Sequence, residues 1–292
     1  MEDSKINKPD SADVSSLDER RADAVSDFSL PIDEHFEEVS ENGRKVRRRG
    51  VYLLPNLLTT GALFSGFYAI IAGMNGDFVN AAVAIIVAAI LDGLDGRVAR
   101  LTNTSSAFGV QYDSLSDMVS FGLAPALVMF SWGLQPIGKY GWAVAFAFAA
   151  CAALRLARFN TQVDTADKRF FTGLASPAAA GLIATTVWVG NATEVGIQLS
   201  IVVGLGTLIA ALLMVSNIRY YSFKGIDFRG RVPFGAILGV VLLIVIIASN
   251  PDVVLLSIGV IYASSGPVWW LWRHREAIRQ RLSWHKTETD NQ

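Results

Sequence analysis

Four aspartates interrupt stretches of sequence that are otherwise apolar enough to cross a membrane. Asp92 and Asp95 lie near the end of one apolar stretch, and Asp113 and Asp117 lie in the next. On insertion scales a charged side chain costs about 2.5–3.5 kcal/mol at the centre of a membrane helix, so carboxylates at such positions usually serve a function. Intramembrane carboxylates typically bind cations or carry protons. The four aspartates therefore predict one of these two functions.

The spacing of the aspartates places them on two helical faces. Asp92 and Asp95 are three residues apart, whereas Gly109, Asp113 and Asp117 form a stripe with a spacing of four. Two antiparallel helices would then direct two carboxylates each into one cleft. Because carboxylates so close repel one another unless cations lie between them, we expect divalent metal ions there. Hard oxygen ligands favour Mg²⁺ or Mn²⁺, and a pair of such ions is a common arrangement for phosphoryl transfer.

Small residues and one arginine accompany the aspartates. Gly93, Gly96 and Gly109 would let a ligand approach the backbone, and Arg100 offers a planar cation to phosphate oxygens. Glycines in membrane helices also allow close helix packing, which is the alternative interpretation of Gly93 and Gly96. A cation or proton transporter is the alternative for the whole cluster. Against it, the four acids gather on two neighbouring helices near one membrane surface.

The composition shows which elements position these residues. Of the 292 residues 52% are hydrophobic and 17% are charged, whereas soluble domains carry about a quarter charged residues. Apolar stretches of the length that crosses a bilayer predict an all-α integral membrane protein with about eight transmembrane helices. The predicted spans are 54–74, 79–101, 106–131, 140–159, 171–190, 197–216, 232–249 and 252–272.

The charges outside the spans predict the orientation and the domains. Residues 1–43 carry 13 acidic and 4 basic residues, few aromatics and no helical periodicity, which predicts a disordered acidic cytoplasmic tail. Residues 44–272 would form the membrane catalytic domain and residues 273–292 a basic cytoplasmic segment. Basic residues cluster at one set of span ends, which places both termini in the cytoplasm. Examples of these basic residues are Arg47, Arg97, Arg100, Arg155, Arg158, Arg219 and Arg273.

The spacing as a whole resembles a known family. The eight positions that carry the resemblance read Asp92-x2-Asp95-Gly96-x2-Ala99-Arg100-x8-Gly109-x3-Asp113-x3-Asp117. The pattern matches the signature of the CDP-alcohol phosphotransferases without a departure. The resemblance implies a helical membrane bundle with a polar cavity facing the cytoplasm, a site for two metal ions and a CDP-linked donor.

The resemblance also implies a role for each site residue. Asp92 and Asp113 would bind both metal ions, Asp95 one of them and Asp117 the other, and Asp117 would also be the general base. The residues expected to bind the CDP-lipid are Asn56, Thr59, Gly93, Gly96, Ala99, Arg100, Ser106 and Gly109.

Other stretches resemble the bacterial phosphatidylserine synthases within this family. They are residues 55–59, 153–160, 171–180 and 216–224, with one departure at Ala175, where related sequences usually have proline. This resemblance implies transfer of the phosphatidyl group from CDP-diacylglycerol to the hydroxyl of L-serine, with release of CMP. It further implies a homodimer in the bacterial inner membrane.

The acceptor is the least determined part of the prediction. Arg155 and Arg158 could hold the carboxylate of serine or the transferred phosphate. Their alternative role is that of a basic pair reaching the membrane surface. The same chemistry with glycerol 3-phosphate or inositol as acceptor also stays open.

Overall fold

A computed structural model describes part of the 292-residue chain. The described residues are 39–41, 44–46, 53–102, 107–161, 170–221 and 234–289. The chain divides into two compact units, Met1–Arg49 and Gly50–Gln292. In the first unit, β1 (Val39–Glu41) and β2 (Arg44–Val46) pair as an antiparallel hairpin. The rest of the predicted acidic tail lies outside the described residues, and its disorder stays a prediction.

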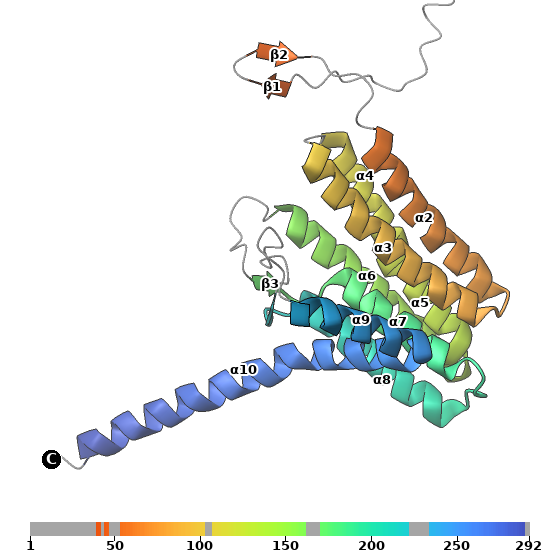
Figure 1. The fold of residues 1–292 in the computed structure, drawn as a ribbon. Helices are drawn as coiled ribbons and strands as arrows, with labels where there is room; N and C mark the ends of the chain where they lie inside the picture. The colour runs from red at the N-terminus through yellow and green to blue at the C-terminus, as the bar shows by residue number, and fades with distance from the viewer. Residues whose placement is uncertain are drawn as a thin grey trace, which may run out of the picture. The chain divides into compact units, whose positions relative to one another are not determined.

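The second unit is helical, which confirms the predicted all-α membrane fold (Figure 1). Its α-helices are α2 (Leu53–Met74), α3 (Phe78–Thr102), α4 (Ala107–Asp117), α5 (Ala124–Met129), α6 (Lys139–Thr161), α7 (Ser176–Gly190), α8 (Ile197–Val215), α9 (Phe234–Ser249) and α10 (Pro251–Thr289). Among the described residues, six helical segments are long and apolar enough to cross a membrane. Two further apolar helices, α7 and the Leu238–Ser249 part of α9, are shorter.

The third membrane segment is one long helix with two widened turns. It comprises α4, the π-helical η1 (Met118–Leu123), α5, the π-helical η2 (Phe130–Leu134) and the short 3-10 turn η3 (Gln135–Ile137). It therefore continues beyond residue 131, where the prediction ended it. A hydropathy pattern does not reveal π turns, because they change the register of the helix without changing its apolar character.

A pair of strands shortens the predicted fifth span. β3 (Phe170–Thr172) pairs antiparallel with β4 (Arg219–Tyr221), so the connection after α6 and the connection after α8 are joined. Gly173 has a φ of 82°, and the helix α7 begins only at Ser176, with proline in its first turn. The span predicted from residue 171 thus starts five residues later.

Close packing of small residues builds the bundle that carries the aspartates. α2 and α3 are joined by a turn at Gly76, whose φ is 78°, and the Asp77 side chain accepts a hydrogen bond from the Asn80 backbone N–H at 3.3 Å. The core between the helices is rich in alanine, which lets backbones approach closely in a membrane. α2 approaches η1 closely at Gly66, where an added Cβ would lie 2.7 Å from Ser120 Cα.

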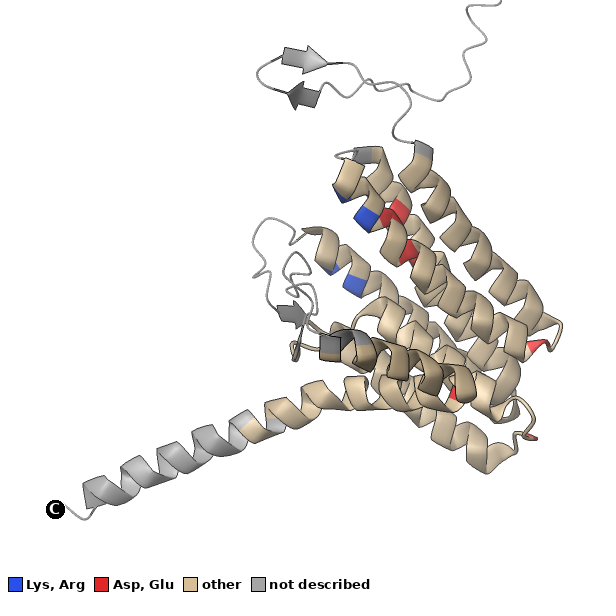
Figure 2. Cartoon of the chain, viewed as in Figure 1, with Lys and Arg blue, Asp and Glu red and all other residues tan. Residues whose placement is uncertain are grey.

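Charged side chains of the bundle gather toward one end. Figure 2 shows acidic residues of α3 and α4 and basic residues of α3 and α6 toward the same end of these helices, while most of the bundle is uncharged. Lys139, the first residue of α6, lies at the other end of that helix. This distribution places carboxylates and guanidinium groups around one site.

Candidate active site

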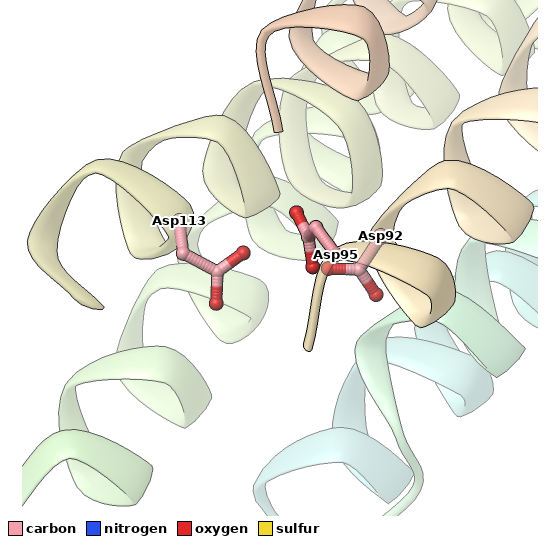
Figure 3. A group of neighbouring side chains, drawn as sticks. All are labelled: Asp92, Asp95 and Asp113. Atoms are coloured by element: carbon pink, nitrogen blue, oxygen red, sulfur yellow. The ribbon is translucent and has the colours of Figure 1, made fainter. Parts of the chain in front are cut away.

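Three carboxylates converge from two helices. Asp92 and Asp95 extend from α3 and Asp113 extends from α4 toward them (Figure 3). Each residue offers one carboxylate oxygen, and these oxygens lie within 4.8 Å of one another. The predicted arrangement of two helices with facing carboxylates is therefore present.

Asp117, the last residue of α4, lies beside the same group. Its carboxyl makes a side-chain hydrogen bond with Asp92 and interacts electrostatically with Asp113 and Asp95. Two carboxyls in such contact need a proton or a cation between them. The four predicted aspartates thus form one cluster.

The donor set fits a divalent metal ion. Oδ1 of Asp113 is buried and has no hydrogen-bond partner among the described residues, so this oxygen is available as a ligand. Carboxylate oxygens gathered in this way are the ligands that hard cations prefer. Asp92, Asp95 and Asp113 together could therefore bind a metal ion.

Hydrogen bonds from α2 and α4 fix the position of the cluster. The Thr59 hydroxyl lies 2.6 Å from Oδ2 of Asp95 and donates to it, and both side chains are almost fully buried. The Ser116 hydroxyl donates to the Thr59 carbonyl at 3.2 Å, and the Ser120 hydroxyl donates to the Ala62 carbonyl at 3.0 Å. α2 is thus bonded on one side to Asp95, a candidate metal ligand, and on the other to the helical segment that carries Asp113.

A cavity of about 200 Å³ lies next to the carboxylates. Its lining comprises Pro55, Asn56, Thr59, Asp95, Gly96, Ala99, Arg100, Gly109, Val110 and Asp113. Six residues predicted to bind the CDP-lipid are therefore brought together around one cavity. Gly93 is not part of this lining, and Ser106 lies outside the described residues.

The two glycines between the aspartates face open space. A Cβ added at Gly93 or at Gly96 would meet nothing within 4 Å. Because no described helix packs against these positions, helix packing does not explain them. The role of the two glycines in ligand access stays a prediction, which the open space around them supports.

The two predicted acceptor residues have different surroundings. Nη1 of Arg155 donates to the Ser176 hydroxyl at 2.6 Å, and the Asp117 carboxylate lies within electrostatic range of the guanidinium. Arg158 instead donates from Nη2 to the Asn217 side-chain oxygen at 2.7 Å and from Nη1 to the Val215 carbonyl at 3.4 Å. The structure thus brings Arg155 toward the aspartates and ties Arg158 to the end of α8.

Some residues around the site had no signal in the sequence. Ser116 and Ser176 are short hydroxyl side chains of ordinary types, and only the packing of their helices shows what they contact. Ser176 and Pro177 open α7, five residues after the predicted start of that span. The contact of Ser176 with Arg155 could not be predicted, because the two residues lie on different helices.

Comparison with known proteins finds the family that the sequence pattern resembles. A family model described as CDP-alcohol phosphatidyltransferase matches residues 52–218. A CDP-diacylglycerol–serine O-phosphatidyltransferase of Helicobacter pylori is 42% identical over 186 residues, which cover 61% of this chain and 76% of that protein.

Two more distant relatives carry similar names. A CDP-diacylglycerol–serine O-phosphatidyltransferase of Mycobacterium tuberculosis is 39% identical over 162 residues, 51% of this chain and 56% of that protein. An archaetidylserine synthase of Methanothermobacter thermautotrophicus is 33% identical over 174 residues, 59% of this chain and 71% of that protein. The matched family region contains all four aspartates.

Proposed function

Since the chain belongs to the CDP-alcohol phosphatidyltransferase family, we propose that it transfers the phosphatidyl group of CDP-diacylglycerol to the hydroxyl of L-serine. The products are phosphatidylserine and CMP. The observation that carries the proposed chemistry is the convergence of Asp92, Asp95 and Asp113 beside a cavity lined by the expected donor contacts. The choice of serine is supported by the relatives whose printed names specify serine transfer.

The aspartates would hold the metal ions that this chemistry uses. Two ions, Mg²⁺ or Mn²⁺, would share Asp92 and Asp113, with Asp95 as a further ligand of one and Asp117 of the other. When bound, they would neutralise the pyrophosphate of the donor and stabilise the departing CMP. The buried, unpartnered Oδ1 of Asp113 supports such a role.

The cavity residues would bind and orient the donor. Asn56 and Arg100 place an amide and a guanidinium at the rim of the cavity, where they can bond the nucleotide and its phosphates. Gly96 and Gly109 leave the backbone accessible there, and Gly93 and Ser106 would extend the same site. Orientation of both substrates is expected to supply a large part of the rate.

Asp117 would act as the general base. It would accept the proton of the serine hydroxyl while that oxygen attacks the lipid-linked phosphorus, and the bond from phosphorus to CMP breaks. General base catalysis contributes about 10²–10⁴-fold to such reactions. Arg155, held near Asp117, would bind the carboxylate of serine and place its hydroxyl beside the base. Arg158 would contribute to the same acceptor region from the end of α6.

The membrane setting follows from the same proposal. The enzyme would reside in the bacterial inner membrane with both termini in the cytoplasm. The basic residues in the last turns of α3 and α6, at the end of the bundle that carries the aspartates, support this orientation. The enzyme would act as a homodimer and take CDP-diacylglycerol from the surrounding lipid.

The test is an assay with one acceptor at a time. Purified protein in detergent receives CDP-diacylglycerol, Mg²⁺ or Mn²⁺, and L-serine, glycerol 3-phosphate or inositol, and both CMP and the lipid product are measured. We expect CMP and phosphatidylserine to form only with L-serine. CMP formed only with another acceptor would contradict the serine assignment, and no CMP with any acceptor would contradict the transferase itself.

A further inference from the structure

The Arg155 guanidinium is satisfied on one side only. Nη1 donates to the Ser176 hydroxyl at 2.6 Å, whereas Nε is buried and has no hydrogen-bond partner among the described residues. A buried N–H of a charged group without an acceptor is costly, and an anionic ligand that accepts its hydrogen bond would remove that cost. The nearby Asp117 makes this a place for an anionic group of a molecule that also meets the general base.

The long helix α10 is docked against this region. Gly259 packs against Leu182 of α7, and Gly266 packs directly on the Tyr220 ring of β4. The Tyr220 hydroxyl donates to the Ala263 carbonyl at 3.0 Å, and burial raises the pKa of Tyr220 to about 12, so this donor stays protonated. One face of α10 is therefore fixed in place by contacts at successive turns.

Tyr262 lies on α10 next to the Tyr220 ring and within electrostatic range of Arg155. Its ring centroid lies 5.6 Å from that of Tyr220, and its side chain is half-buried. The tyrosine and the Arg155 guanidinium interact electrostatically. A polar side chain of α10 thus lies within electrostatic range of the arginine that the Ser176 hydroxyl holds near Asp117.

We propose that Tyr262 is a specificity-determining residue that, together with Arg155, recognises the carboxylate of the amino-acid acceptor. The inference rests on the proposed function and deepens it. The matched family region ends at residue 218, so α10 would add an acceptor contact from outside that region. Ser176, which is fully buried, acts as a positioning residue that holds the guanidinium.

The physical reason is that two donors from different helices fit one carboxylate. The guanidinium supplies charge and direction, and the tyrosine hydroxyl donates to a lone pair that the guanidinium leaves open. An acceptor without a carboxylate would leave the buried Nε of Arg155 without an acceptor for its hydrogen bond. Sites built in this way reject analogues that lack the bonded group far more strongly than apolar pockets reject size differences.

The experiment compares Tyr262→Phe with the wild-type enzyme. Removal of the hydroxyl should raise the KM for L-serine at least about tenfold, the factor for one hydrogen bond to a charged group, with the KM for CDP-diacylglycerol unchanged. Ethanolamine has the hydroxyl and amine of serine but no carboxylate. The preference for L-serine over ethanolamine, as a ratio of kcat/KM, should therefore fall by a similar factor. If the wild-type enzyme does not turn over ethanolamine, the KM for L-serine alone tests the inference.

Matched variants separate recognition from structure. Tyr140→Phe removes an exposed tyrosine hydroxyl at the start of α6 and should leave all three constants unchanged. Ser176→Ala should raise the KM for L-serine as Tyr262→Phe does.

A KM for L-serine within about twofold of wild type in Tyr262→Phe would overturn the inference. So would an equal loss of activity with both acceptors, because that is the result of a structural role. A wild-type enzyme that releases no CMP with L-serine would contradict the proposed function instead, and this inference with it.

Discussion

The hydroxyl of Thr59 in α2 donates a hydrogen bond to Oδ2 of Asp95 in α3 across 2.6 Å. Thr59 is 4% exposed and Asp95 is 5% exposed, so both partners of this bond are almost fully buried. The bond fixes the orientation of a carboxylate that belongs to the candidate metal site. Substitution of a residue that holds a metal ligand in this way typically lowers the affinity for the metal about 10–100-fold.

Thr59→Val tests this role. Valine has nearly the shape of threonine but lacks the hydroxyl, so the Asp95 carboxylate loses its donor. We expect the Mg²⁺ or Mn²⁺ concentration for half-maximal CMP release to rise about 10–100-fold.

Thr59→Ser, which keeps the hydroxyl, should restore most of the affinity for the metal. The neighbouring Thr60→Val removes a hydroxyl that bonds Asn56 and Tyr112 instead, and it should leave the metal dependence near that of wild type. Equal metal dependence in Thr59→Val and wild type would argue against a positioning role.

Asp117→Asn tests the general base. Asparagine keeps the size and one oxygen of the side chain but cannot accept the proton, so turnover should fall by at least about 10²–10⁴-fold. Binding of CDP-diacylglycerol, measured by equilibrium titration, should largely survive. Asp252→Asn at the start of α10 removes a carboxylate outside the cluster and serves as the control. Full activity in Asp117→Asn would rule out its assignment as the base.

Removal of the metal should affect both activity and stability. A chelator should abolish CMP release, and adding back Mg²⁺ or Mn²⁺ should restore it. A ligand that binds only the folded state raises the unfolding temperature as its concentration rises, so thermal unfolding in detergent should shift upward with added metal. The Oδ1 atom of Asp113 has no hydrogen-bond partner among the described residues. Asp113→Asn, which replaces this carboxylate by an amide, should weaken that shift markedly. A metal-dependent shift of the same size in this variant would show that the ion binds elsewhere.

The membrane helices could be predicted because their signal is local. Runs of apolar residues and glycine or proline turns define most helix ends to within a few residues, as for α3 and α8. The π turns in η1 and η2 could not be predicted in this way. Neither could the pairing of β3 with β4, because it joins segments about 50 residues apart that are each only three residues long.

The aspartates could be predicted because charge in a membrane span is rare and their spacing fixes their helical faces. Thr59 was expected to contact the donor. The structure shows in addition that it bonds Asp95, a contact between residues 36 positions apart. Tyr262 was not predicted at all. A tyrosine in an apolar helix is unremarkable until the packing of that helix is known.

Gly96→Ala separates ligand access from packing. An added Cβ at this position meets nothing within 4 Å, and alanine favours helix by about 1 kcal/mol over glycine. The variant should therefore be as stable as wild type or more stable. Because Gly96 lines the cavity, the methyl group should nevertheless raise the KM for CDP-diacylglycerol. A KM equal to that of wild type would show that the donor does not approach this part of α3.

Gly66→Ala should give the opposite result, because α2 packs closely against η1 at this glycine. An added Cβ would lie 2.5 Å from the Ser120 Oγ and 2.7 Å from its Cα, and a backbone atom cannot move away without shifting the helix. We expect a loss of about 1–3 kcal/mol in the free energy of unfolding. Activity should fall as well, since η1 directly follows Asp117.

The matched control for this substitution is Gly239→Ala in α9. An added Cβ at Gly239 meets nothing within 4 Å, so this variant gains helix propensity without a clash. Comparison of the two by thermal unfolding and CMP release isolates the effect of the helix contact. If Gly66→Ala were as stable and active as Gly239→Ala, the spacing of α2 and η1 would not be what positions Asp113 and Asp117.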